Sequence, residues 1–596
     1  MRSTFEFHGT LLNIPCPDPR RLPAHEFVFA FSHWFHLNKT DSSALPGHES
    51  VTFTIAHTQD PSVQFASARG MTAMRPLWAS YFSVEELLTF HYLDFPAASA
   101  LAAKYSAQLA VDAYQSGAND YVDIVALSAR QVMGAVTFVG TPEKPLIFMK
   151  EISSDGNTQT IDVLYPAFPF FLYSNPQWLA YMLEPLIEHM LSGQYPNKYA
   201  MHDLGTHFPN ATGHPDGADE YMPVEECGDI LIMGLAMVHA FQNQDVNAAG
   251  LFTSEDAGED IVSRILYSDP ANVFSLSVDH NGAVPYLDAP HSPQQARNKA
   301  KRWVERSYLL WQRWTGYLVE YSLRPENQLS TDDFAGRLGL QTNLALKGII
   351  GIRAMSEMAK VVGNVVDAEF YGNISQTYVT KWVGYALSRD RTHTKLAYNW
   401  WGSWSTLYNL YADSLLCFRV PRQASDPVDP DARSPDTTVA GTSLTQQQQQ
   451  QQQRRRQKPI FLPDDGGNNG HPHHPHHPAP PQPSFVPTEI YTLQSKWYSQ
   501  VHQRYGLPLD SRHLYTKTDW EFFAVAVASP AVRSTVLASV AHWVNETSTD
   551  RPFTDLHETE GTGGFPGITF FARPVVGGHF AFLALERACG GRAGQG

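Results

Sequence analysis

The chain has 596 residues, of which 43% are apolar and 12% aromatic, enough to bury a large core distributed over roughly two to four domains. Only 17% of the residues are charged and the formal net charge is -16, which excludes an extended basic surface for nucleic acid or for an anionic membrane. The longest apolar stretches contain charges or are too short to cross a bilayer, so no transmembrane helix is expected.

The N-terminal part of the chain has the composition of β-structure. Residues 1–14 lack the compact apolar run of a signal peptide, so no export signal is visible in the sequence. Residues 26–35 and 50–55 mix aromatic residues, Val and Thr in short runs separated by Pro and Gly, a pattern that predicts strands. Residues 1–80 are therefore expected to form a β-rich N-terminal region.

Helical periodicity begins near residue 83 and dominates the rest of the chain. Apolar residues recur at spacings of three and four over residues 84–90, 97–113, 178–191 and 301–321, which predicts amphipathic helices. Residues 330–363 are expected to form the clearest helix, with capping oxygens at its start, an apolar stripe, and Gly363 at its end. Residues 81–423 and 488–596 are interpreted as two parts of one helical domain.

Two polar segments interrupt the helical pattern. Residues 243–298 have no sustained periodicity and are expected to form a surface excursion. Residues 424–487, with a poly-Gln run and a His/Pro tract, have the composition of a disordered insertion. The four cysteines lie far apart and indicate neither a zinc module nor a dense disulfide framework. Glycosylation triplets occur at Asn38, Asn210, Asn373 and Asn545, which supports secretion weakly.

Polar stretches near predicted helix ends carry the candidate chemistry, because loops on a helical scaffold usually hold the site. The first, residues 150–156, follows a strand-like apolar run at residues 145–149. The second, residues 199–226, ends in closely spaced carboxylates that include Glu225 and Glu226. Like-charge repulsion and burial raise carboxylate pKa values and prepare such groups for general acid–base catalysis. The alternative for both glutamates is a helix start, where acids are favoured.

The third polar stretch, residues 327–343, contains Asp332 and Asp333, and the fourth spans residues 509–579. In the fourth stretch Arg512 and Arg573 offer paired hydrogen bonds to a carboxylate. His202 and His207 are expected to make hydrogen bonds rather than to bind a metal, since no third ligand follows from their spacing. The sequence has no nucleophile elbow, phosphate loop or zinc-protease helix.

Motifs distributed along the chain resemble, in the same order, those of the fungal glutaminase A family. The matching runs are KEISSDG at 150–156, HDLG at 202–205, PNATGH at 209–214, MPVEECG at 222–228, QLSTDDFAG at 328–336, QTNLALKGIIG at 341–351, LYNLYAD at 407–413, YTK and DWE at 515–521, and ARPVVGGHF at 572–580.

The resemblance implies a mainly α fold, an α/α toroid of the six-hairpin glycosidase type preceded by a truncated β-sandwich-like N-terminal region. It implies hydrolysis of L-glutamine to L-glutamate and ammonia, with glutamine as the small-molecule partner. The charge and the apolar stretches predict no nucleic acid or membrane partner, and no cofactor and no metal are expected. It also implies an extracellular or cell-wall glycoprotein.

The hypothesis for the mechanism is that Glu225, Glu226 or Asp333 deprotonates water, a protonated Asp332 or His202 assists departure of ammonia, and Arg512, Arg573 or Arg130 binds the α-carboxylate. The candidate catalytic residues are Glu225, Glu226, Asp333, Asp332, His202 and Asp203. The candidate substrate-binding residues are Arg130, Lys150, Glu151, Asp155, Glu220, Lys517, Arg512, Arg573 and His579.

Three alternatives stay open. A covalent acyl-enzyme through Ser330, Thr331 or Thr516 leads to the same products. A glycoside hydrolase of the six-hairpin type would use two of the same carboxylates. A non-catalytic relative would use none of them.

Overall fold

The computed structural model describes residues 2–10, 33, 50–242, 293–326, 328–419, 484–549, 551–567 and 570–591. Most of each predicted insert, residues 243–292 of the first and 424–483 of the second, lies outside the described residues. The chain divides into two compact units, one formed by residues 1–59 and 82–96 and the other by residues 60–81 and 97–596. Among the described residues no helix is long and apolar enough to span a membrane.

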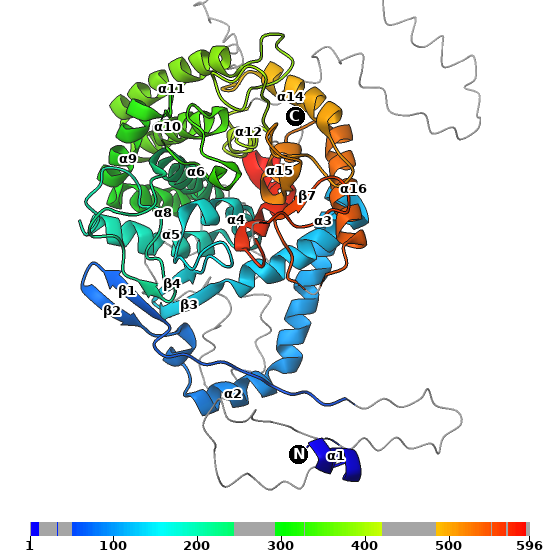
Figure 1. The fold of residues 1–596 in the computed structure, drawn as a ribbon. Coiled ribbons are helices and arrows are strands. Elements are labelled where there is room, and N and C mark those ends of the chain that lie inside the picture. The colour runs from blue at the N-terminus through cyan, green and yellow to red at the C-terminus, as the bar shows by residue number, and fades with distance from the viewer. Residues whose placement is uncertain are drawn as a thin grey trace, which may run out of the picture. The chain divides into compact units, whose positions relative to one another are not determined.

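The fold is mainly α, as predicted (Figure 1). The α-helices are α1 Arg2–His8, α2 Val84–Leu93, α3 Phe95–Gly134, α4 Ile161–Ser174, α5 Pro176–Leu191, α6 Pro223–Gln242, α8 Pro293–Arg306, α9 Tyr308–Tyr321, α10 Thr342–Val362, α11 Val365–Ala386, α12 Leu410–Leu415, α14 Thr488–Val501, α15 Thr518–Ala526, α16 Pro530–Glu546 and α17 Ala581–Arg587. Two 3-10 helices matter for the site, η2 Asp333–Ala335 and η3 Pro574–Phe580.

The strands form small sheets in the larger unit. The strands are β1 Val63–Ser67, β2 Gly70–Met74, β3 Val136–Thr141, β4 Lys144–Met149, β5 Asn210–Ala211, β6 Tyr515–Lys517 and β7 Leu556–Glu558. β1 pairs antiparallel with β2 and parallel with β5, while β3 pairs with β4 and β6 with β7. The strand expected at residues 145–149 is thus confirmed as β4.

The expected strand at residues 50–55 is wrong. These residues carry no strand, and nearly all of them are exposed. Alternating aromatic and β-branched residues favour a strand only where a neighbouring strand satisfies the backbone and one face is buried. The other expected N-terminal strand, residues 26–35, lies outside the described residues apart from His33.

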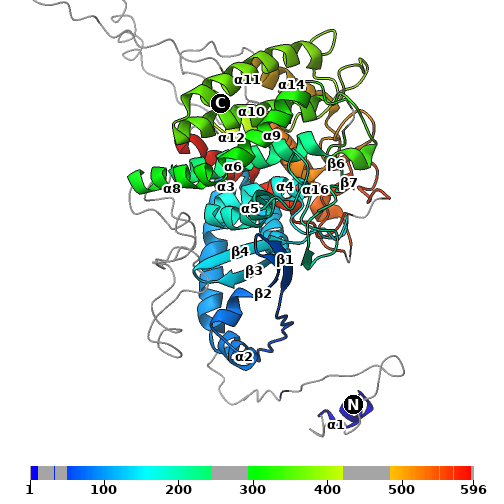
Figure 2. The same cartoon turned by 90° about the vertical axis from the view of Figure 1, so that its left-hand side faces the viewer.

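Helices of the larger unit, drawn in a second view in Figure 2, fall into two groups by the number of residues that they bury. Nearly every residue of α4, α6, α10, α15 and α17 is buried, whereas α11 and α16 bury a single stripe. α10 packs against α6, α9 and α11, and α4 packs against α6 and η3. A helix buried on all sides needs neighbours on all sides. The core of the larger unit is therefore formed by α4, α6, α10 and α15, and the polar loops lie at their ends.

The helix predicted for residues 330–363 ends as expected but begins later. Gly363 is its C-cap, with φ of 84°, in the left-handed region that glycine adopts without strain. α10 starts only at Thr342, and Gln341 at its N-cap makes no side-chain capping bond. Asp332 does not cap a helix, because it accepts hydrogen bonds from the Gln341 amide and the Tyr408 hydroxyl.

Both inserts are shorter than predicted. α8 begins at Pro293, inside the stretch of residues 243–298 expected to lie on the surface. Phe485 and Val486 are buried although they were assigned to the disordered segment 424–487, and the Phe485 amide donates to the Phe418 carbonyl. A few apolar residues at the margin of a polar segment suffice to anchor it to the core.

Close packing between α10 and its neighbours leads to a stability prediction. A Cβ added at Gly348 would lie 2.4 Å from the Cβ of Ser322 and 3.1 Å from Val224 Cγ1. Gly348→Ala is therefore expected to destabilise the protein by about 1–3 kcal/mol, as overpacked cores do. The control is Gly384→Ala in α11, where no atom lies within 4 Å of an added Cβ. There the higher helix propensity of alanine is expected to increase the free energy of unfolding by up to ~1 kcal/mol. Equal effects of the two substitutions in urea unfolding would contradict the packing argument.

Candidate active site

His202 lies at the centre of an acidic cluster drawn from distant parts of the chain. Its Nε2 atom is 3.7 Å from Asp162 Oδ1, 3.7 Å from Glu220 Oε2 and 3.7 Å from Glu226 Oε1. Asp333 joins the same group, since its carboxylate interacts with Asp162, His202 and Glu220. Asp162, His202, Glu220, Glu226 and Asp333 are called the His202 cluster below.

Local structure explains how these side chains converge. Asp162 lies in the first turn of α4 and Glu226 in the first turn of α6, positions that acids favour because the helix dipole is positive there. The prediction that Glu225 and Glu226 begin a helix is therefore confirmed. His202 and Glu220 belong to the loop between α5 and α6, and Asp333 begins η2.

Asp203 fixes the orientation of His202. Asp203 Oδ2 lies 2.8 Å from His202 Nδ1, and Oδ1 lies 2.8 Å from His214 Nε2 and 2.6 Å from the Gly205 amide nitrogen, which donates to it. Burial opposes the charge of His202, but the hydrogen bond to Asp203 and the neighbouring carboxylates outweigh it and raise the His202 pKa to about 10. Asp203 is thus an orienting residue that contacts the Nδ1 side of the His202 ring.

Three acids of the cluster, Glu226, Glu220 and Asp333, have pKa values above those of ordinary carboxyls. Burial, and then repulsion from Asp162, raises the pKa of Glu226 well above its usual value. Glu226 is 1% exposed, and neither of its carboxylate oxygens has a hydrogen-bond partner among the described residues. Burial also raises the pKa values of Glu220 and Asp333. Glu220 is the most accessible member, with 41% of its side chain exposed.

Glu225 does not face this cluster as a free base, because it is bound to a buried lysine. Lys347 pairs with Glu225 and lies 2.8 Å from Asp229 Oδ1, and all three side chains are buried. The Lys347 ammonium also lies 4.4 Å from the centre of the Tyr165 ring. The burial of Glu225, opposed by Lys347, raises the Glu225 pKa to about 7. This triad of Lys347, Glu225 and Asp229 joins α10 to α6 by buried ion pairs.

Asp332 and Arg512 belong to a neighbouring network rather than to the cluster. Burial raises the pKa of Asp332, against the hydrogen bond from Tyr408. Arg512 makes a two-pronged contact with Asp510, at 3.0 Å from Nε to Oδ1 and 2.7 Å from Nη2 to Oδ2, and donates to the Gly336 carbonyl. These contacts tie Arg512 to Asp510 and to the Gly336 carbonyl, two segments far apart in the sequence.

A second charged group contains Glu151, Arg573 and Lys517. Arg573 Nη1 lies 3.2 Å from Asp555 Oδ2, and Nη2 lies 4.0 Å from Glu151 Oε1. Lys517 pairs with Asp519 and lies 3.8 Å from Asp555. Asp162 contributes to the electrostatic environment of both Glu151 and Arg573, which links this group to the His202 cluster. The Nε atom of Arg573 has no hydrogen-bond partner in the described part of the chain.

Three further predicted substrate-binding residues, Lys150, Asp155 and His579, are exposed or already bonded. Lys150 and Asp155 are exposed, and Asp155 accepts a hydrogen bond from the adjacent Gly156 amide. His579 is fully buried with Nδ1 at 2.7 Å from Ser128 Oγ and Nε2 at 2.8 Å from Thr518 Oγ1, and burial lowers its pKa to about 3. It is a neutral packing residue.

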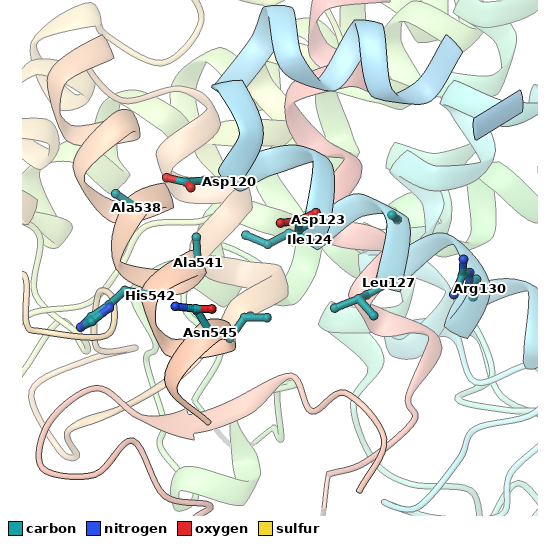
Figure 3. Close-up of a pocket in the computed structure, with 11 residues that line it drawn as sticks. Asp120, Asp123, Ile124, Leu127, Arg130, Ala538, Ala541, His542 and Asn545 are labelled. Carbon is teal, nitrogen blue, oxygen red and sulfur yellow. The ribbon is translucent and has the colours of Figure 1, made fainter. Parts of the chain in front are cut away.

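Arg130 lies on the exposed side of α3, at one end of a pocket of about 700 Å³ between α3 and α16 (Figure 3). Asp120, Asp123 and His542 line the same pocket. None of the residues of the His202 cluster lines this pocket, and the role of Arg130 in binding the substrate carboxylate stays a prediction. A polar loop or helix end can be recognised from sequence, but the face to which its side chains point depends on packing.

Asp162 follows the first polar stretch closely in sequence, but it was given no role among the candidate site residues. It interacts electrostatically with members of both charged groups, among them His202, Glu226 and Asp333. Lys347 was also missed, although it is the one charge in an apolar helical run at residues 344–352. Two signals in the sequence could have indicated these residues. Lys347 is a lone cation inside an apolar run, and Asp162 is an acid at the start of an otherwise apolar helix.

Glu521 provides a pH prediction close to this network. Its carboxylate accepts hydrogen bonds from the Leu507 amide and the Thr516 hydroxyl, yet burial raises its pKa to about 8. A raised folded-state pKa means that stability present below pH 4.5 is lost as pH rises to about 8. Glu521→Gln mimics the protonated acid and is expected to be more stable than the parent at pH 9 by roughly 3–5 kcal/mol, with no gain at pH 4. A constant difference in urea unfolding at both pH values would refute the assignment.

Comparisons with known proteins fit this arrangement. The sequence profile of the glutaminase A six helical-hairpin domain matches residues 118–250, 282–426 and 482–583, and a domain of unknown function, DUF5127, matches residues 1–112. The chain is 55% identical to a probable glutaminase of Arthroderma benhamiae over 100% of its own length and 65% of that protein's. It is 37% identical to glutaminase A of Aspergillus oryzae over 98% of its own length and 67% of that protein's. The chain thus spans about two thirds of each relative, and it belongs to the glutaminase A family.

Proposed function

We propose that this protein hydrolyses L-glutamine to L-glutamate and ammonia at the His202 cluster. The observation that carries the proposal is the convergence of Asp162, His202, Glu220, Glu226 and Asp333 from separate segments in a chain 55% identical to a relative named as a probable glutaminase. Clustered carboxyls with raised pKa values are suited to move protons near neutral pH.

Asp333 and Glu220 are the proposed proton-transfer pair. They interact through a hydrogen bond: the charge of Asp333 raises the pKa of Glu220, whereas the hydrogen bond from Glu220 lowers the pKa of Asp333. Two such carboxyls share a proton, so that one is ionised and the other is not. In the proposed reaction ionised Asp333 takes a proton from water, the water oxygen attacks the amide carbon, and protonated Glu220 supplies the proton with which ammonia leaves when the C–N bond breaks. Asp333 was predicted as a base; Glu220 takes the acid role that Asp332 and His202 were expected to have.

Arg573 and Glu151 are the proposed anchors for the amino-acid end of the substrate. Of the three arginines predicted to bind the α-carboxylate, Arg573 is the one linked to the cluster through Asp162. Glu151 lies 4.0 Å from Arg573 and offers an acid for the α-ammonium group. Opposite charges at fixed separation orient a zwitterionic substrate.

The proposal extends to architecture and location. We propose an α/α toroid formed by residues 81–423 and 488–596. It is supported by the buried helices α4, α6, α10 and α15 and by α11 and α16, which bury only one face. A disulfide between Cys417 and Cys589, with Cα atoms 5.7 Å apart, supports an oxidising compartment. The glycosylation triplets at Asn210, Asn373 and Asn545 are exposed, which supports an extracellular glycoprotein.

The test is release of ammonia from glutamine, asparagine and a neutral glutamyl amide by the full chain. Turnover of glutamine with loss of rate for the neutral amide supports the proposal, because that substrate cannot engage both anchors. Oligosaccharides assayed for reducing sugar serve as the parallel arm. No release from glutamine by protein with a cooperative unfolding transition would refute the proposal.

A further inference from the structure

We propose that Asp162, His202 and Glu226 bind a divalent transition-metal ion such as Zn²⁺ or Mn²⁺. Site formation rests on the geometry of these three residues. Only its catalytic use, which is to polarise the amide carbonyl as a Lewis acid beside Asp333 and Glu220, rests on the proposed function. The inference replaces the sequence-based expectation of no metal.

The spacing of the ligand atoms fits a metal ion. His202 Nε2 is 3.7 Å from Asp162 Oδ1 and 3.7 Å from Glu226 Oε1, and the three residues offer ligand atoms within 4.8 Å of one another. In a tetrahedral site with bonds of about 2.0–2.2 Å, neighbouring ligands lie about 3.3–3.6 Å apart. An ammonium group with charged hydrogen bonds of about 2.7–2.9 Å would hold its acceptors about 4.4–4.7 Å apart. The distances to His202 are close to the metal value.

An ordinary ion pair does not account for the geometry. A protonated imidazole normally donates Nε2–H to one carboxylate at hydrogen-bond distance, as the 2.8 Å contact of Nδ1 with Asp203 illustrates. Nε2 instead lies at the same 3.7 Å from Asp162, Glu220 and Glu226. At this distance Nε2 makes no direct hydrogen bond to any of the three carboxylates.

The surroundings of the two buried ligands point the same way. Asp203 accepts from His202 Nδ1 and is itself held by His214 and the Gly205 amide, the carboxylate–histidine arrangement that directs a ring nitrogen lone pair at a metal. Glu226 is 1% exposed and both of its oxygens lack hydrogen-bond partners in the described part of the chain. A buried carboxyl without donors keeps its proton unless a cation binds it, so Glu226 is free to exchange a proton for a metal ion.

Charge and ligand type narrow the identity of the ion. Among the described residues, His202 is the only basic side chain within 4.0 Å of Asp162, Glu220 or Glu226. The carboxylates therefore outnumber the basic side chains, and a dication would neutralise this excess of negative charge. Glu220, whose carboxylate is partly exposed, could be a further ligand, or water could take that position. One imidazole with carboxylates suits Zn²⁺ or Mn²⁺, whereas Ca²⁺ prefers six to eight oxygens.

The test is isothermal titration calorimetry of chelator-treated full chain with ZnCl₂ and with MnCl₂, and with CaCl₂ as a comparison. A tract of histidines outside the proposed site could also hold zinc: His471, His473, His474, His476 and His477. Every protein sample in the titration, the parent included, therefore has these five residues replaced by serine. We expect one ion per chain for Zn²⁺ or Mn²⁺. Asp162→Asn, His202→Asn and Glu226→Gln are expected to abolish binding. His202→Asn keeps a donor for Asp203 while removing Nε2. Asp203→Asn is expected to weaken binding by about 10- to 100-fold.

Asp155→Asn is the matched control, since it removes an exposed carboxylate outside the cluster, and it should bind as the parent does. Absence of a binding event in the parent, or unchanged binding in the three ligand variants, would overturn the inference. Ammonia release measured on the same samples separates the two proposals. Metal binding without glutamine hydrolysis refutes only the function, whereas hydrolysis by protein that binds no metal refutes only the metal site.

Discussion

Replacing Lys347 by methionine is expected to destabilise the protein by about 3–5 kcal/mol, the cost of leaving a buried ion pair without one partner. Lys347 is 0% exposed and its ammonium contacts both Glu225 and Asp229. Without it, the two carboxyls must remain protonated in the folded state. A raised folded-state pKa contributes stability at low pH that is lost as pH rises, so the deficit in urea unfolding should be smaller at pH 5 than at pH 8.

A matched control lies on the same helix. Lys360 in α10 pairs with Glu357 but is 54% exposed, so Lys360→Met is expected to change stability by ~0–1 kcal/mol. The triple variant Lys347→Met, Glu225→Gln, Asp229→Asn removes all three charges and is expected to recover most of the loss. If Lys347→Met and Lys360→Met were equally stable, the buried triad would not support the fold as inferred.

Replacing Asp333 by asparagine is expected to lower kcat for glutamine hydrolysis by about 10²–10⁴-fold, the usual contribution of a general base. Asp333 is half-buried and its carboxylate interacts with Asp162 and His202. Asparagine keeps the size of the side chain and cannot take a proton from water. Because this effect lies in proton transfer, KM should change much less than kcat.

The control for this prediction is Asp155→Asn, an equivalent substitution on an exposed loop, which should leave kcat unchanged. The thermal unfolding midpoint of Asp333→Asn should also stay within a few degrees of the parent, so that lost activity is not lost folding. A variant with parental kcat would remove Asp333 from the mechanism and leave the base to another carboxyl of the cluster.

Local patterns predicted elements well and boundaries less well. Periodic apolar stripes at residues 84–90, 97–113 and 178–191 lie in α2, α3 and α5, and Gly363 ends α10. The start of α10 was misplaced because Ser330, Thr331 and Asp332 have the composition of a cap, while their side chains are buried. Capping preference is a local property, and it was overridden by the contacts of Asp332 with Gln341 and Tyr408.

The candidate site divides in the same way. The sequence indicated the stretches that contain His202, Glu226 and Asp333, which lie in one cluster. It also nominated Arg130, Arg512 and His579, which are directed elsewhere or already bonded. Residue type and motif position identify a chemical capability, but they do not show which partner already uses it.

The sequence by itself determined the helical class, the exclusion of a basic nucleic-acid surface, and the loops that hold reactive groups, since these depend on composition and on periodicity within single segments. Only the tertiary structure shows three pairings. Asp162 lies beside His202, Lys347 forms an ion pair with Glu225, and Cys417 forms a disulfide with Cys589. Those pairings join residues 40 to 172 positions apart. Such contacts are set by helix packing and burial, which no local pattern encodes.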